Sequence, residues 1–157
     1  MVNETIETDP DNSSTALANR IVATWRLKSH IQHTLATGER FPPRGLKPQG
    51  LVTYTDDGRF SLINVPSERP KPKAIQATQE EALALFFGLT AYAGRYTIEG
   101  NTVVHHVEVS WNEAWTGTQQ RRRFKVEGDE LTLIAGPSAN HMDGQVVEAT
   151  LVWERVR

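Results

Sequence analysis

The stretch that decides the fold is Ala91–Ser110, which reads AYAGRYTIEGNTVVHHVEVS. Gly100 and Asn101 form a two-residue turn of the kind that joins antiparallel strands, because both residue types tolerate the positive φ angles of such turns. The flanking segments alternate between apolar and polar residues, which is typical of a strand with one buried face. The sequence therefore predicts a hairpin with strands at 94–99 and 102–110.

The register of this hairpin assigns each side chain to a face, because successive strand residues point to opposite sides of a sheet. One face pairs Ile98 with Val103, Tyr96 with His105 and Gly94 with Val107; the other pairs Thr97 with Val104, Arg95 with His106 and Ala93 with Glu108. The first face is the more apolar, so we expect it to line an interior in which His105 and Tyr96 form a polar pair. His106 then lies outside, in a charge cluster with Arg95 and Glu108.

Two further hairpins follow the same pattern. In the first, Asp56-Asp57-Gly58 joins strands at 50–55 and 59–65, with Tyr54 opposite Phe60 and Val52 opposite Leu62. In the second, Gly128-Asp129 joins strands at 118–127 and 130–135, with Val126 opposite Leu131, Phe124 opposite Leu133 and Arg122 opposite Ala135. We expect Arg122 to point inward near one end of its strand, while Arg121, Arg123 and Lys125 face water.

The remaining segments complete one domain at 16–157, after an acidic tail at 1–15 that we expect to be disordered. A short helical turn at 17–22 precedes a first strand at 24–29, and a last strand spans 145–156. Residues 37–49 and 66–72 are rich in proline, which predicts loops, and the first is long enough to cover a barrel mouth. Thr78 and Glu81 form a capping box for one helix at 78–89, whose wide apolar stripe predicts packing against the sheet.

These elements indicate the fold class. Counting a weaker stretch at 31–35, the chain holds roughly eight strand candidates, which suits a small closed barrel with room for one ligand. The sequence therefore predicts an all-β, eight-stranded antiparallel up-and-down barrel with one helix inserted between strands.

Composition narrows the classes of partner. The chain has 157 residues and a net charge of −2, so nothing in its charge favours nucleic acid. Its longest apolar run, 82–89, is far too short to span a membrane, and residues 1–12 lack a secretory signal. The absence of cysteine excludes disulfides and cysteine-bound metals and fits a cytoplasmic protein. We expect no cofactor, and a monomer or a homodimer.

Several motifs resemble a known family. Ala23-Thr24-Trp25 looks like the Gly-x-Trp signature of lipocalins with alanine in place of glycine, and Arg155 matches the arginine that packs across that tryptophan. The blocks at 50–59, 91–96, 104–108 and 115–119 resemble the lipocalin-like domain family of small microbial proteins. The resemblance implies a calycin-type barrel. Some barrels of this kind in natural-product pathways act as cyclases, pericyclases or isomerases, and others only bind, so fold alone does not assign a reaction.

Three hypotheses for function follow. In the first, the barrel binds a small hydrophobic molecule or natural-product intermediate, using the interior residues Tyr54, Phe60, Leu62, Asn64, Tyr96, His105, Val107, Trp111, Trp115, Arg122 and Phe124. In the second, the protein is a cofactor-free isomerase, cyclase or lyase, with His105 as general acid or base and Tyr96 or Arg122 stabilising developing negative charge. In the third, side chains fill the barrel and the protein is structural.

Each candidate residue also has a simpler explanation. An inward histidine beside a tyrosine is often a satisfied core pair, and Trp111 and Trp115 either roof the pocket or only fasten their loop. Adjacent histidines on a strand point to opposite faces, so His105 and His106 do not predict a metal site. His30 and His33 share neither an obvious partner nor a face, and we expect no bound metal.

Overall fold

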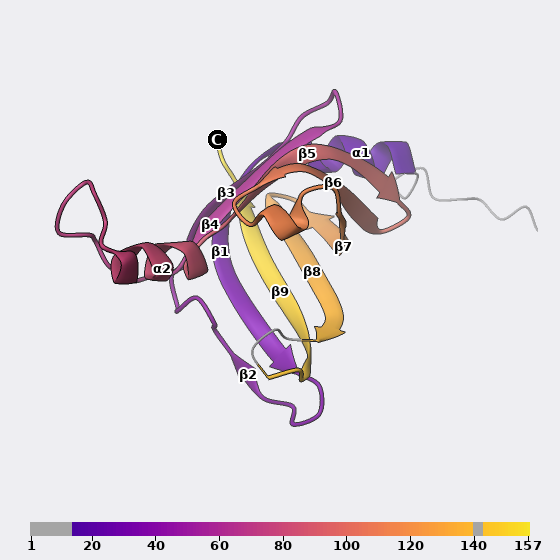
Figure 1. Ribbon diagram of the computed structural model, residues 1–157. Helices are drawn as coiled ribbons and strands as arrows, with labels where there is room; N and C mark the ends of the chain where they lie inside the picture. The colour runs from indigo at the N-terminus through magenta and orange to yellow at the C-terminus, as the bar shows by residue number, and fades with distance from the viewer. Residues whose placement is uncertain (1–13, 140–142) are drawn as a thin grey trace, which may run out of the picture.

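Nine antiparallel strands form one continuous sheet that closes on itself in the computed structural model, which describes residues 14–139 and 143–157 (Figure 1). The elements are α1 (Ser14–Ile21), β1 (Ala23–Thr34), β2 (Arg40–Phe41), β3 (Gln49–Tyr54), β4 (Arg59–Val65), α2 (Gln79–Phe87), β5 (Thr90–Glu99), β6 (Thr102–Ser110), the 3-10 turn η2 (Glu113–Trp115), β7 (Gln119–Glu127), β8 (Glu130–Ala139) and β9 (Val146–Arg155). The strand order is β2-β1-β3-β4-β5-β6-β7-β8-β9, and β1 also pairs with β9. Eight strands therefore close the barrel, β2 lies outside it, and the predicted fold class is confirmed.

The strand that closes the barrel differs from its prediction. β1 continues through the stretch at 31–35 as one strand, because an irregularity between Leu27 and Ser29 lets it bend and keep pairing with β9. The predicted loop at 37–49 contains the two-residue strand β2, which pairs with Gln32 and His33. β5 and β8 extend beyond their predicted limits, to Thr90 and Ala139. The predicted acidic tail at 1–15 lies outside the described residues except for the first two residues of α1.

The hairpin of β5 and β6 has the predicted register over most of its length, with Tyr96 opposite His105. A bulge between Ala93 and Gly94 then shifts the pairing, so that Ala93 lies opposite Val109. The predicted pairs of β3 with β4 are confirmed, as in Tyr54 with Phe60, and so are Phe124 with Leu133 and Val126 with Leu131 in β7 and β8. The pairing of β7 with β8 starts at Arg123, so it does not include the predicted pair of Arg122 with Ala135.

The predicted charge cluster on the outer face is partly correct. The bulge places Val109, and not Glu108, opposite Ala93. The carboxylate of Glu108 pairs with Arg95 at 3.4 Å and with Arg59 at 2.6 Å. His106 does not join the cluster, since its Nε2 lies 2.9 Å from the hydroxyl of Thr97.

One end of the barrel is filled by large side chains, among them Trp25 and Trp153, which are both fully buried. The guanidinium of Arg155 lies 4.4 Å from the centre of the Trp25 ring, which confirms the predicted cation–π contact. Trp25 Nε1 donates to the carbonyl of Ile21, so α1 seals this end. We call this the packed half; its buried members are Ile21, Trp25, Tyr54, Phe60, Tyr96, Val103, His105, Val107, Phe124, Val126, Leu131 and Trp153.

The predicted helix forms, but its predicted packing is wrong. α2 has the capping box, in which the Thr78 hydroxyl accepts from the Glu81 N–H and the Glu81 carboxylate accepts from the Thr78 N–H. No residue of α2 is buried, and Phe87 is 76% exposed. Figure 1 shows α2 standing away from the barrel. Its apolar residues follow one another around the helix instead of forming one stripe, so no single face directs it onto the sheet. Neither this helix nor any other in the described part of the chain is long and apolar enough to cross a membrane.

Candidate functional site

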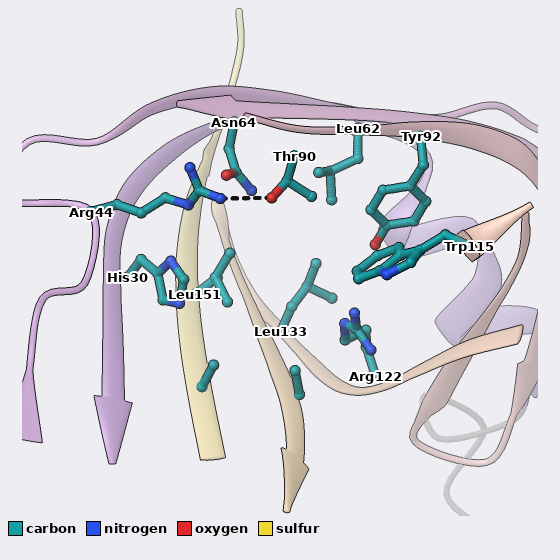
Figure 2. Close-up of a pocket in the computed structure, with 12 residues that line it drawn as sticks. His30, Arg44, Leu62, Asn64, Thr90, Tyr92, Trp115, Arg122, Leu133 and Leu151 are labelled. Carbon is teal, nitrogen blue, oxygen red and sulfur yellow. Dashed lines mark hydrogen bonds between the residues drawn. The ribbon is translucent and has the colours of Figure 1, made fainter. Parts of the chain in front are cut away.

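A partly enclosed cavity of about 150 Å³ lies in the half of the barrel opposite α1 (Figure 2). We call this the open half. Six strands, β1, β4, β5, β7, β8 and β9, contribute lining residues, and the loop before β3 and the turn η2 complete the wall. The lining residues are His30, Arg44, Leu62, Asn64, Thr90, Tyr92, Trp115, Arg122, Leu133, Ala135, Ala149 and Leu151.

The loop at 37–49 reaches the cavity through Arg44. Its Nη2 donates to the hydroxyl of Thr90 at 2.7 Å. The carbonyl of Arg44 accepts from the backbone N–H of Ser67 at 2.8 Å, so the two proline-rich loops hold each other where they cross the barrel end. This loop was expected to cover a mouth, and Arg44 is the residue with which it does so.

Arg122 enters the same cavity from β7, on the side opposite Arg44, as Figure 2 shows. Its inward direction was predicted from the alternation of β7. Its Nη1 donates to the carbonyl of Arg121 at 2.9 Å. Within residues 14–139 and 143–157, neither Arg44 nor Arg122 forms an ion pair, and no acidic side chain lines the cavity. The electrostatic character of the open half is therefore positive.

His105 lies beneath the cavity and does not line it. The side chain is fully buried, stacked on Phe60 with ring centres 4.2 Å apart. Its Nε2 lies 2.8 Å from the hydroxyl of Tyr54, and its Nδ1 lies 3.1 Å from the hydroxyl of Tyr92. Burial, and then the positive charge of Arg122, hold the pKa of His105 well below its usual value. The imidazole is therefore neutral near pH 7.

The predicted polar pair of Tyr96 with His105 is corrected by these contacts. Tyr96 is opposite His105 in register, but its hydroxyl donates to the carbonyl of Thr55 at 2.8 Å, toward the sealed end. The ring of Tyr54 lies edge-on to Tyr96 at 5.1 Å and takes the position beside the imidazole. The second partner, Tyr92, has no predicted role because the predicted strand began two residues after it.

The eleven predicted lining residues divide between the two halves. Leu62, Asn64, Trp115 and Arg122 line the cavity. Trp111 lies edge-on to Trp115, with ring centres 5.1 Å apart, and also contacts Phe86 of α2; of the two tryptophans, only Trp115 borders the cavity. The other six belong to the packed half: Tyr54, Phe60, Tyr96, His105, Val107 and Phe124. A role in ligand binding stays a prediction for each of the eleven.

Two buried polar atoms at the cavity have no hydrogen-bond partner among the residues that the structure describes. They are Oδ1 of Asn64, a residue only 4% exposed, and Nδ1 of His30. Burial, and then the charge of Arg44, lower the pKa of His30 to about 4, so this ring is also neutral near pH 7. Two further unpartnered atoms, Nε1 of Trp111 and of Trp153, belong to residues that do not line the cavity.

Sequence reasoning missed eight of the lining residues. The polar ones are His30, Arg44, Thr90 and Tyr92, and the apolar ones are Leu133, Ala135, Ala149 and Leu151. For Tyr92 the signal was present, since it lies an even number of residues from Tyr96 and so shares its face. Among the described residues, no three histidine, aspartate or glutamate side chains come together as a metal ion requires.

Comparison with known proteins gives a family but no activity. A family model described as a lipocalin-like domain matches residues 22–156. No curated protein matches the chain in sequence. Among solved structures, the chain is similar to a lipocalin-like protein from Bacteroides uniformis ATCC 8492, with 13% identity and a TM-score of 0.46, over 87% of this chain and 99% of that chain.

Proposed function

Because the chain belongs to the lipocalin-like domain family, we propose that its barrel binds a small, largely apolar molecule in the open half. The observation that carries this proposal is the pair of unpartnered polar atoms, on Asn64 and His30, beside an otherwise apolar cavity wall. A buried polar group without a hydrogen bond costs about 1–3 kcal/mol, and a bound molecule with a complementary group removes that cost. Leu62, Leu133 and Leu151 supply the apolar contact surface.

The size of the cavity limits the ligand. A cavity of about 150 Å³ is roughly what holds one benzene molecule in other proteins. The ligand is therefore either a one-ring compound or one end of a longer molecule, such as a natural-product intermediate, that extends past the loop carrying Arg44. The packed half resembles the filled barrel of the structural hypothesis, so the binding proposal rests on the open half alone.

The geometry supports binding more than acid–base catalysis by His105. A general acid or base must reach its substrate within hydrogen-bond distance or through one water. His105 is separated from the cavity by Tyr92, and both of its ring nitrogens already contact tyrosine hydroxyls. Tyr96 faces the sealed end. Of the three groups in the catalytic hypothesis, only Arg122 borders the cavity.

Calorimetric titration with benzyl alcohol, a neutral one-ring probe, tests the proposal. We expect saturable binding with a stoichiometry of one and quenching of tryptophan fluorescence through Trp115. The variant Ala149→Leu fills the cavity and is expected to abolish binding, whereas Ala82→Leu adds the same atoms on the exposed surface of α2 and leaves binding unchanged. Binding that survives Ala149→Leu in a folded protein places the ligand elsewhere and contradicts the proposal.

A further inference from the structure

The two arginines of the open half differ from their neighbours in having no counter-charge. Arg121 and Arg123, on either side of Arg122 in β7, face outward and pair with Glu99 and Glu148. Arg122 and Arg44 form no ion pair in the described part of the chain, and their hydrogen bonds go to neutral oxygens: Arg44 donates to the hydroxyl of Thr90, and Arg122 donates to the carbonyl of Arg121 and to the hydroxyl of Tyr92. A guanidinium carries five N–H donors, so most of the donors at the cavity are unused.

Burial makes these free donors significant. Arg44 is half-buried, and desolvation lowers its pKa from the usual value, although an arginine stays charged in proteins. A partly desolvated positive charge without a partner is unfavourable, and an anion that enters the site relieves the cost. Arg44 and Arg122 lie on opposite sides of the cavity (Figure 2), so both guanidinium groups border the space that a bound anion would occupy.

The hydrogen-bond network below the cavity supplies a third donor. Burial raises the pKa of Tyr54 well above its usual value, so its hydroxyl keeps its proton, and that hydroxyl lies 2.8 Å from Nε2 of His105. To avoid a buried O–H without an acceptor, Tyr54 must donate to Nε2. The neutral imidazole then carries its proton on Nδ1 and donates it to the oxygen of Tyr92.

The proton of Tyr92 is consequently free for a ligand. Burial raises the pKa of Tyr92 and keeps it protonated, while Arg122, which is only a donor, partly opposes that rise. Since both of its polar neighbours donate to the Tyr92 oxygen, the O–H has no acceptor among them and borders the cavity. Arg44, Arg122 and Tyr92 thus present donors only, on three separate segments of the fold.

We propose that the ligand of the open half is a small organic carboxylate, whose oxygens lie between Arg44, Arg122 and the Tyr92 hydroxyl. Its apolar body then rests on Leu62, Leu133 and Leu151. This inference rests on the proposed function and adds the charge of the ligand to it. The pairing is of the strong kind, because charge-assisted hydrogen bonds from guanidinium groups to carboxylates gain both energy and direction.

Benzoate and benzyl alcohol together test this inference, since they share the ring and differ in charge. We expect the full-length protein to bind benzoate roughly 10- to 100-fold more tightly than benzyl alcohol, as hydrogen bonds to charged groups predict. Arg44→Met and Arg122→Met should each weaken benzoate binding about tenfold or more and leave benzyl alcohol binding within about twofold. Tyr92→Phe should weaken benzoate binding in the same direction.

Arg121→Met is the matched control, because it removes an arginine one residue away whose side chain faces outward and pairs with Glu99. It is expected to leave benzoate binding unchanged. Retained benzyl alcohol binding shows that each variant is folded. If the wild-type protein binds both probes equally, the carboxylate inference is wrong while the proposed function stands; if it binds neither, the proposed function itself fails. Acetate that binds as tightly as benzoate contradicts the role of the apolar wall.

Discussion

Acid should destabilise this protein through His30, and the size of the effect follows from its position. The ring is mostly buried and faces Arg44, and these two causes lower its pKa from 6.5 to about 4. The unfolded chain then binds a proton between these values that the folded protein does not. The contribution of His30 to the free energy of unfolding is therefore fully present above about pH 6.5. As the pH drops below that value, it falls by about 1.4 kcal/mol per pH unit. The total from His30 is about 3 kcal/mol by pH 4.

The variant His30→Gln isolates this contribution. Urea unfolding at several pH values between 7.5 and 4.5 gives the slope of the unfolding free energy against pH. In the variant this slope should be smaller than in the wild type by the contribution of one titrating group, about 1.4 kcal/mol per pH unit. His105 acts in the same direction, so the wild-type slope exceeds that of one histidine. Leu131→Ala removes a fully buried side chain of the packed half and no titratable group, so it should lower stability at every pH and keep the wild-type slope. Equal slopes in wild type and His30→Gln would refute the reasoning.

Three other substitutions test the fold. Gly94→Ala places a Cβ against the carbonyl oxygen of His106, closer than any real Cβ contact, so the bulge must shift and urea unfolding should show a loss of about 3 kcal/mol or more; a loss below about 1 kcal/mol would contradict the close approach. Arg155→Met removes the cation–π contact with Trp25 and should cost about 0.5–2 kcal/mol in thermal unfolding, and an unchanged midpoint would mean that the contact adds nothing. Thr78→Ala removes the helix cap and should speed amide exchange in α2, yet leave the global unfolding free energy within about 0.5 kcal/mol, because α2 buries no residue; a larger change would show that the helix supports the barrel.

The hairpins could be predicted from sequence because their turns leave little choice. Gly58, Gly100 and Gly128 each adopt a positive φ, which glycine reaches without strain, and a short turn determines which residues face each other. The apolar faces of these hairpins and the inward direction of Arg122 follow from that register.

His30 was missed because β1 departs from strict strand alternation. Strict alternation from Trp25 and Leu27 places Ser29 inside and His30 outside. The shift between Leu27 and Ser29 reverses this, so that His30 pairs with Leu151, which also lines the cavity. A bulge depends on contacts between distant strands and has no local pattern that announces it here.

Arg44 and α2 show a second limit. Arg44 lies in a proline-rich loop without periodicity, so only its hydrogen bond to Thr90 reveals that it faces the cavity. The capping box predicted where α2 begins, but capping is a local property and does not decide what a helix packs against. Because α2 packs against no other element over most of its surface, the rings of Phe86 and Phe87 are exposed.

The division of the barrel into two halves has a consequence for how such a protein can diversify. Most of the rigid aromatic packing, including Trp25 and Trp153, lies where no ligand reaches, so tolerance to mutation is concentrated at the other end. There, Ala135 and Ala149 are small enough to be exchanged for larger residues that reshape the cavity. Natural variation or directed evolution can therefore change the ligand while the scaffold keeps its reserve of stability.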